Sequence, residues 1–193
     1  ILGRILGAPE EDGDWLTEKG DALIGNTDSD FTTHVVDQVD TEEYRLMPFR
    51  SPAAVELFDY AEKQAKLKRN SDSQDVMSML LRPLKSGEYL TDLEFKNFLT
   101  LVVAAGSDTT RYSIAASLHA IANHPSLLEQ LQRTEDASWE TVTNELIRWA
   151  SPTMHFRRTA TQDIELHGKQ IKAGDKVVFW WISGNRDEAV FDN

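Results

Sequence analysis

The sequence predicts a mainly α-helical protein with a small β-sheet, an α+β fold. Helix-start signals run through about the first three quarters of the chain, and short β-rich runs separated by turn residues fill the rest. The chain has 193 residues, of which 40% are hydrophobic and 27% charged. This composition is typical of a globular chain long enough to bury a core.

The first half of the sequence contains start signals for separate helices. Pro9 followed by the acidic run 10–12 predicts a helix, since proline suits the first turn and acids interact favourably with the positive end of the helix dipole. Ser51-Pro52 opens another in the same way. The expected helices are 9–24, 52–69 and a short one from 76 to near Pro83, and 25–50 is expected to be mostly loop.

A long helix is expected next. Thr91 and Glu94 form a capping box, and no proline follows until Pro125. One helix of about 30 residues fits this interval, well above the usual length. Shorter helices are expected over 127–133 and, with Ser138 as its cap, over 139–149.

The chain changes character after Ser151-Pro152. A strand is expected over 155–160, and a β-rich run over 176–182. Between them, His167-Gly168 separates two short apolar-polar runs, which predicts a β-hairpin.

The charge pattern limits the partners. The net charge is -12, and residues 1–45 hold 12 acidic against 3 basic residues. An acidic chain without a basic stripe argues against nucleic acid and anionic membranes. No apolar run approaches the ~20 residues of a membrane span. Cysteine is absent and no histidine has ligand spacing, so no metal site is expected in this chain.

The middle of the long helix is the first candidate site. Gly106 costs about 1 kcal/mol against alanine in a helix, and Ser, Asp and Thr beside it are also poor helix formers. Small side chains here would let a flat ligand approach the backbone, and Asp108 with Thr109 would offer an acid and a hydroxyl for moving protons. A small-residue helix crossing with an incidental carboxylate explains the same pattern.

Two charged patterns follow it. Glu145 and Arg148 share a helix face, although a solvated surface pair has the same spacing. Arg157 and Arg158 fall on opposite faces of a strand, so one could point inward towards an anion. Two exposed arginines on an edge strand are the alternative.

These three features, in this order, resemble cytochrome P-450 monooxygenases. Residues 105–110 resemble the oxygen-binding groove of the long central helix of that family, and Glu145–Arg148 resembles its E-x-x-R helix. Arg158 resembles the strand arginine that binds a haem propionate. Further similarity lies at His124-Pro125, 173–175, 185–187 and Phe191. The resemblance covers nearly the whole chain and implies the middle part of the cytochrome P-450 fold.

The resemblance implies a role for each matching residue. Asp108 and Thr109 would deliver protons to bound oxygen, and Ala105 and Gly106 would border the oxygen site. Glu145 and Arg148 would support the haem-binding core, and Arg158 would bind haem. The residues expected to line an apolar substrate pocket are Leu101, Ala104, Met154 and Phe156.

The implied activity is hydroxylation of a lipophilic small molecule: a sterol side chain, terpene, branched lipid or alkane. The implied cofactors are haem b and O2, with NAD(P)H electrons delivered by a ferredoxin reductase and a ferredoxin. The haem-ligand cysteine would lie outside this sequence. We therefore expect 1–193 to be a single partial domain, an internal fragment that is inactive alone.

A second expectation concerns the E-x-x-R pair. In the family a further arginine completes this pair, and the resemblance places that arginine beyond residue 193. We expect Glu145 and Arg148 to be left with only each other.

Two alternatives remain. A degenerate helical fragment could act as a non-catalytic interaction module. A relative that catalyses rearrangement or dehydration without external electrons is also conceivable, but the acid-threonine pair argues against it.

Overall fold

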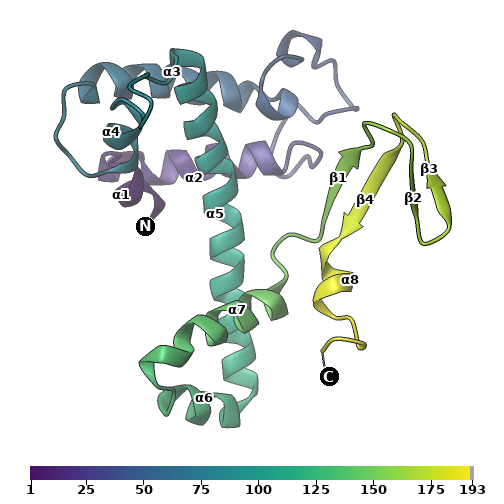
Figure 1. Cartoon of the computed structure of the whole chain (residues 1–193). Helices are drawn as coiled ribbons and strands as arrows, with labels where there is room; N and C mark the ends of the chain where they lie inside the picture. The colour runs from purple at the N-terminus through teal and green to yellow at the C-terminus, as the bar shows by residue number, and fades with distance from the viewer. Residues whose placement is uncertain (192–193) are drawn as a thin grey trace. The chain divides into compact units, whose positions relative to one another are not determined.

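The computed structural model describes residues 1–191 and divides the chain into two compact units (Figure 1). Unit 1 is Ile1–Asp108, and unit 2 begins at Thr109. The fold class is confirmed, because the chain is mainly helical and carries small antiparallel sheets. That 1–193 form a single partial domain stays a prediction.

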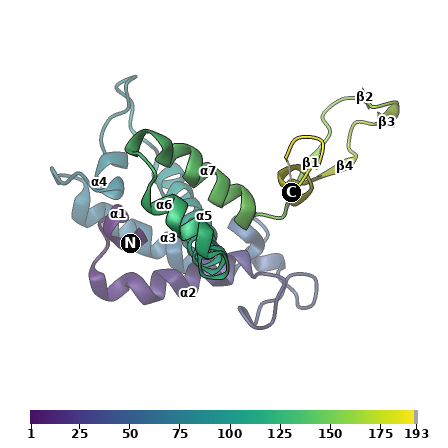
Figure 2. The same cartoon turned by 90° about the horizontal axis from the view of Figure 1, so that it is seen from below.

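Unit 1 is built from helices around the N-terminal half of α5 (Figures 1 and 2). Its helices are α1 (Leu2–Leu6), α2 (Gly13–Ile24), α3 (Pro52–Lys68), α4 (Val76–Leu80) and the first part of α5 (Asp92–Asn123). Short 3-10 turns lie at Glu10–Asp12, Glu42–Tyr44 and Pro48–Arg50. The acidic run after Pro9 therefore forms a 3-10 turn ahead of α2, and α1 was not predicted.

The core of unit 1 joins all of these helices. Its buried members are Leu6, Leu16, Leu23, Ala53, Ala54, Leu57, Ala61, Ala65, Met77, Leu81, Phe95, Leu99, Val103 and Ala104. At Gly20, α2 comes close to α5, since a Cβ there would lie 3.3 Å from the Val103 carbonyl oxygen and 3.4 Å from the Ser107 Cβ. The absence of a side chain at this point permits the close approach.

Asp75 ties three segments of unit 1 together. Its carboxylate caps α4 by accepting from the Ser78 amide at 2.9 Å and hydroxyl at 2.8 Å. It also accepts from Lys68 Nζ at 3.2 Å. Gly7 ends α1 with a φ of 76°, and a Cβ there would overlap the Asp75 side chain.

The long helix begins as the sequence predicts. The Thr91 amide donates to Glu94 Oε2 at 2.8 Å, and the Glu94 amide donates to Thr91 Oγ1 at 3.2 Å, which completes the capping box. α5 has 32 residues and is α-helical at every one of them, including the small polar run 105–110.

Unit 2 continues α5 and adds helices and strands. They are α6 (Pro125–Gln132), α7 (Trp139–Ala150), β1 (His155–Thr159), β2 (Ile164–Leu166), β3 (Lys169–Ile171), β4 (Lys176–Trp180) and α8 (Trp181–Asn185). β1 pairs antiparallel with β4, and β2 pairs antiparallel with β3, as two separate sheets. In the β2–β3 turn, His167 and Gly168 have φ values of 48° and 73°, the positive values that a type I′ turn requires.

Two sequence expectations in unit 2 are wrong in detail. The β-rich run stops at Trp180, because Trp181 is the first residue of α8. Ser138 precedes α7, but its side chain makes no capping hydrogen bond there, since it is the last residue of a 3-10 turn (Asp136–Ser138) and is in a helical conformation.

Burial differs sharply between the units. From 109 to 191, only Ala120, Ala150 and Ser151 are buried. Large apolar side chains of unit 2 are instead half exposed, among them Tyr112, Leu118, Phe156, Phe179 and Trp180.

Candidate functional site

The predicted oxygen groove lies on a continuous stretch of α5. Leu101, Ala105 and Thr109 follow one another at four-residue spacing, which places them in one row along the helix. Leu101 is 56% exposed, whereas Ala104 is 1% exposed and belongs to the core of unit 1. Of the two residues predicted from α5 to line a substrate pocket, Leu101 is therefore on the surface and Ala104 is packed inside.

Gly106 lies against α1. A Cβ at this position would be 3.2 Å from Leu2 Cδ1, tighter than an ordinary van der Waals contact. The small residue therefore permits a close helix contact, as the packing interpretation of this motif expects. Its role at an oxygen site stays a prediction, as do the roles of Asp108 and Thr109.

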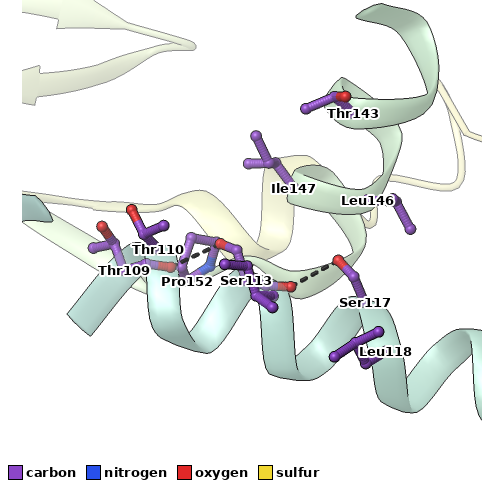
Figure 3. A pocket seen from close by; sticks show the side chains of 10 residues that line it. Thr109, Thr110, Ser113, Ser117, Leu118, Thr143, Leu146, Ile147 and Pro152 are labelled. Atoms are coloured by element: carbon purple, nitrogen blue, oxygen red, sulfur yellow. Dashed lines mark hydrogen bonds between the residues drawn. The ribbon is translucent and has the colours of Figure 1, made fainter. Parts of the chain in front are cut away.

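A pocket of about 510 Å³ lies between the second half of α5 and α7 (Figure 3). Its lining residues are Thr109, Thr110, Ser113, Ile114, Ser117, Leu118, Thr143, Leu146, Ile147 and Pro152. Ser113 Oγ donates to the Thr109 carbonyl at 2.8 Å, and Ser117 Oγ donates to the Ser113 carbonyl at 2.7 Å. Because these hydroxyl protons go to their own helix, the pocket walls are more apolar than their composition indicates. The hydroxyls recur every four residues from Thr109, a pattern that sequence reasoning passed over.

The structure brings Glu145 and Arg148 together on α7. Arg148 donates from Nε to Glu145 Oε2 at 2.7 Å and from Nη2 to Oε1 at 2.6 Å, a bidentate pair. The Arg148 side chain is 17% exposed and that of Glu145 is 57% exposed. The hydrogen bonds from Arg148 hold the pKa of the Glu145 carboxyl below its ordinary value, although burial opposes this. The bonds to Glu145 likewise raise the pKa of the Arg148 guanidinium.

Arg148 has further partners. Its Nη1 donates to the backbone carbonyl of Asn185, and its guanidinium carbon lies 4.3 Å from the centre of the Phe191 ring. The expectation that Glu145 and Arg148 are left with only each other is therefore wrong. The stretch after β4 supplies a carbonyl that accepts from Arg148 and an aromatic face that packs against its guanidinium, so Arg148 has partners besides Glu145.

The β1 strand carries the predicted haem arginine. Phe156 pairs with Phe179 and Arg158 with Val177 across the sheet, and the two-residue period puts all four on one face. The Arg158 guanidinium carbon lies 5.4 Å from the centre of the Phe156 ring. Met154 directly precedes the strand and is 55% exposed. Arg157 occupies the other face, and both arginines are exposed.

Comparisons with known proteins point to the same family as the sequence motifs do. The cytochrome P450 family model matches residues 53–137. The steroid C26-monooxygenase of Mycobacterium tuberculosis is 35% identical over 192 residues, which cover 100% of this chain and 40% of that protein. The methyl-branched lipid omega-hydroxylase of the same organism is 32% identical over 191 residues, 99% of this chain and 42% of that protein.

A solved structure agrees in fold. A Mycobacterium marinum cytochrome P450 in complex with pseudoionone superposes with a TM-score of 0.79 at 33% identity, covering 98% of this chain and 44% of the other. The chain belongs to the cytochrome P450 family. It spans about two fifths of the length of these relatives.

Membership of the P450 family implies haem, and β1 fits one side of that group. An exposed guanidinium beside an aromatic ring suits a ligand that combines carboxylates with a flat apolar surface. The sequence contains no cysteine, so these 193 residues do not supply a thiolate ligand. Within 1–191, no group of three or more His, Cys, Asp or Glu side chains could hold a metal ion.

None of the helices described over 1–191 combines the length and apolarity that crossing a bilayer requires.

Proposed function

We propose that this P450 chain forms part of a haem-thiolate monooxygenase that hydroxylates a lipophilic small molecule with O2. The observation that carries the proposal is the similarity of the whole of this chain to 40% of a steroid C26-monooxygenase, together with the bidentate Glu145–Arg148 pair. The named substrates of the relatives are a steroid and a methyl-branched lipid. Exposed apolar side chains at Leu101, Met154 and Phe156 support a substrate of that class.

The proposed roles separate binding from proton transfer. Haem, when bound, supplies the oxygen activation that lets one oxygen atom enter a C–H bond. Arg158 would hold a propionate by charge, and Asp108 with Thr109 would move protons. Residues proposed to border the oxygen and substrate sites are Leu101, Ala105, Gly106, Met154 and Phe156, whereas Ala104 is packed in the core of unit 1. Glu145 and Arg148 would support the core without touching substrate.

The electron donors follow from the same proposal. We place NAD(P)H, a ferredoxin reductase and a ferredoxin upstream of the enzyme, in the cytoplasm. Reconstitution with each donor left out in turn tests this assignment, since product should appear only when the chain of donors is complete.

A carbon monoxide difference spectrum of the reduced protein tests the haem proposal. The sample is expressed from the longest natural reading frame that contains these residues. We expect the long-wavelength Soret band of a thiolate-bound haem. The absence of a haem signal from that frame would refute the proposal and favour the interaction module.

The two faces of β1 allow a sharper version of this test. Arg158→Gln should weaken haem retention, because it removes a cation from the face that also carries Phe156. Arg157→Gln removes the same charge from the opposite face and should leave haem content unchanged. Equal loss in both variants would contradict the assignment of Arg158.

A further inference from the structure

Ser151 and Arg186 donate hydrogen bonds to the carbonyls of the last turn of α7. A helix leaves its final carbonyls without partners inside the helix. Here the Ser151 amide donates to the Ile147 carbonyl at 2.9 Å, and Ser151 Oγ donates to the Arg148 carbonyl at 2.7 Å. Arg186 Nη2 donates to the next carbonyl, that of Trp149, at 3.1 Å. Ser151 itself is buried, and its backbone has the left-handed helical conformation, with a φ of 47°.

Asn185 contacts this capped end at two points. Its side-chain Nδ2 donates to Ser151 Oγ at 3.1 Å. Its backbone carbonyl accepts from Arg148 Nη1. The hydrogen bonds therefore close a ring that runs from the Arg148 guanidinium through Asn185 and Ser151 to the Arg148 backbone.

The ring has a fixed direction. A serine hydroxyl carries one proton, and Ser151 donates it to the Arg148 carbonyl. The bond to Asn185 must then use a lone pair of the hydroxyl, so residue 185 has to be a donor. An amide meets this requirement, whereas a carboxylate does not.

We propose that Asn185 is a positioning residue that holds the Arg148 guanidinium through Ser151. The Asn185 amide donates to the Ser151 hydroxyl and orients it. The hydroxyl then donates to the Arg148 carbonyl at the end of α7. The Asn185 carbonyl accepts from the Arg148 guanidinium and holds it beside Glu145. Ser151 is also where the chain leaves α7 towards β1, so the same ring sets the start of the strand that carries Arg158. The inference rests on the proposed function only for the role of Arg158.

Water exchange of the Arg148 Nε–H, followed by ¹⁵N NMR on the protein expressed from the longest natural reading frame that contains these residues, tests the proposal independently of activity. Asn185→Ala keeps the backbone carbonyl but removes the amide, and should speed this exchange about fivefold, as expected for one lost hydrogen bond. Asn144→Ala is the matched control. Asn144 is an exposed residue of α7, the helix that carries Arg148, and its loss should leave the Arg148 exchange unchanged.

A second variant separates positioning from folding. Ser151→Gly removes the hydroxyl, and glycine suits the positive φ at this residue, so the helix end is kept. It should speed the Arg148 exchange as much as Asn185→Ala does. The double variant should be no faster than either single variant, because both remove the same path. Amide exchange in the middle of α7 should not change in any of them.

Two results would overturn the inference. One is an unchanged Arg148 exchange in Ser151→Gly or in a folded Asn185→Ala. The other is additive acceleration in the double variant, which would mean that Asn185 does not act through Ser151. Either result would leave the haem proposal standing, since the carbon monoxide spectrum tests that separately.

Discussion

At the scale of single residues, the Asp75 carboxylate accepts hydrogen bonds from both Ser78 and Lys68. Burial acts to raise the pKa of its carboxyl. Hydrogen bonds from Ser73 and Ser78 act in the opposite direction, as does the one from Lys68. The hydrogen bonds prevail and hold the pKa well below its ordinary value. Asp75 is therefore charged in the folded chain at pH values where an unfolded chain would protonate it.

This difference predicts a pH-dependent loss of stability. An unfolded aspartate has a pKa of about 3.9, so the contribution of Asp75 is complete above about pH 5 and falls as the pH drops towards the lower folded pKa. Asp75→Asn should lower the free energy of unfolding by about 1–3 kcal/mol at pH 7 and by less at pH 3. Urea titrations at both pH values measure the difference. Asp72→Asn, at an exposed neighbour, should show none, and an Asp75→Asn deficit that does not depend on pH would contradict the explanation.

Thr109 gives a prediction about chemistry. Thr109→Ala in the haem-containing protein should leave haem binding intact and lower the product formed per O2 consumed, because the proposed proton path loses its hydroxyl. Thr109→Ser restores a hydroxyl and should recover most of the coupling. Thr110→Ala removes an identical side chain from the next position and serves as the control. Normal coupling in Thr109→Ala would refute the proton-delivery role.

Residue spacing alone could not show which of the two Glu–Arg pairs has a partly buried arginine with further partners. Glu42–Arg45 and Glu145–Arg148 have the same spacing, and both form ion pairs. The Arg45 side chain is 62% exposed, whereas that of Arg148 is 17% exposed and meets Asn185 and Phe191 as well. Those partners lie far along the sequence, so nothing near Arg148 in the chain indicated them.

At the scale of elements, α2 approaches the backbone of α5 closely at Gly20. Gly20→Ala gains helix propensity, about 1 kcal/mol, but places a Cβ 3.3 Å from a backbone oxygen that α5 holds in position. We expect net destabilisation of about 1 kcal/mol by urea titration. Gly13→Ala lies on the same helix with nothing within 4 Å of its Cβ, and should be neutral or slightly stabilising. Stabilisation by Gly20→Ala would contradict this prediction and show that α5 moves aside to accommodate the added methyl group.

Elements with local signals were predicted well. The capping box at Thr91 and the turn at His167-Gly168 both formed, because each depends on residues within one turn of chain. α1 is five residues long and has no capping side chain, so it left no signal. Trp181 has a strong strand preference but follows the last residue paired with β1, and α8 begins there.

At the scale of the whole molecule, burial is concentrated in unit 1. The core cluster lies between Leu6 and Ala104, whereas unit 2 buries few residues and exposes large aromatic ones. Periodicity in the sequence could indicate which faces are apolar, but not how much of each face this chain covers. That depends on the partners of each face and not on its own pattern.

The difference in burial between the two units predicts that their backbone amides are unequally protected from hydrogen exchange. Amides of α3, which carries six buried residues, should exchange with solvent about tenfold or more slowly than those of the β2–β3 hairpin, whose residues are nearly all exposed. Hydrogen exchange followed by mass spectrometry on the 193-residue chain measures both regions in one sample. Equal protection would mean that unit 2 is covered in solution, for example by a second copy, and sedimentation would then report the dimer.

The capped end of α7 also has a consequence for the order of folding. Ser151 and Asn185 are 34 residues apart, and the chain between them must reverse through the β1–β4 pairing before they meet. Contacts across such a separation close late, after local helices have formed. Losing them should therefore shorten the lifetime of the folded state while leaving its rate of formation nearly unchanged.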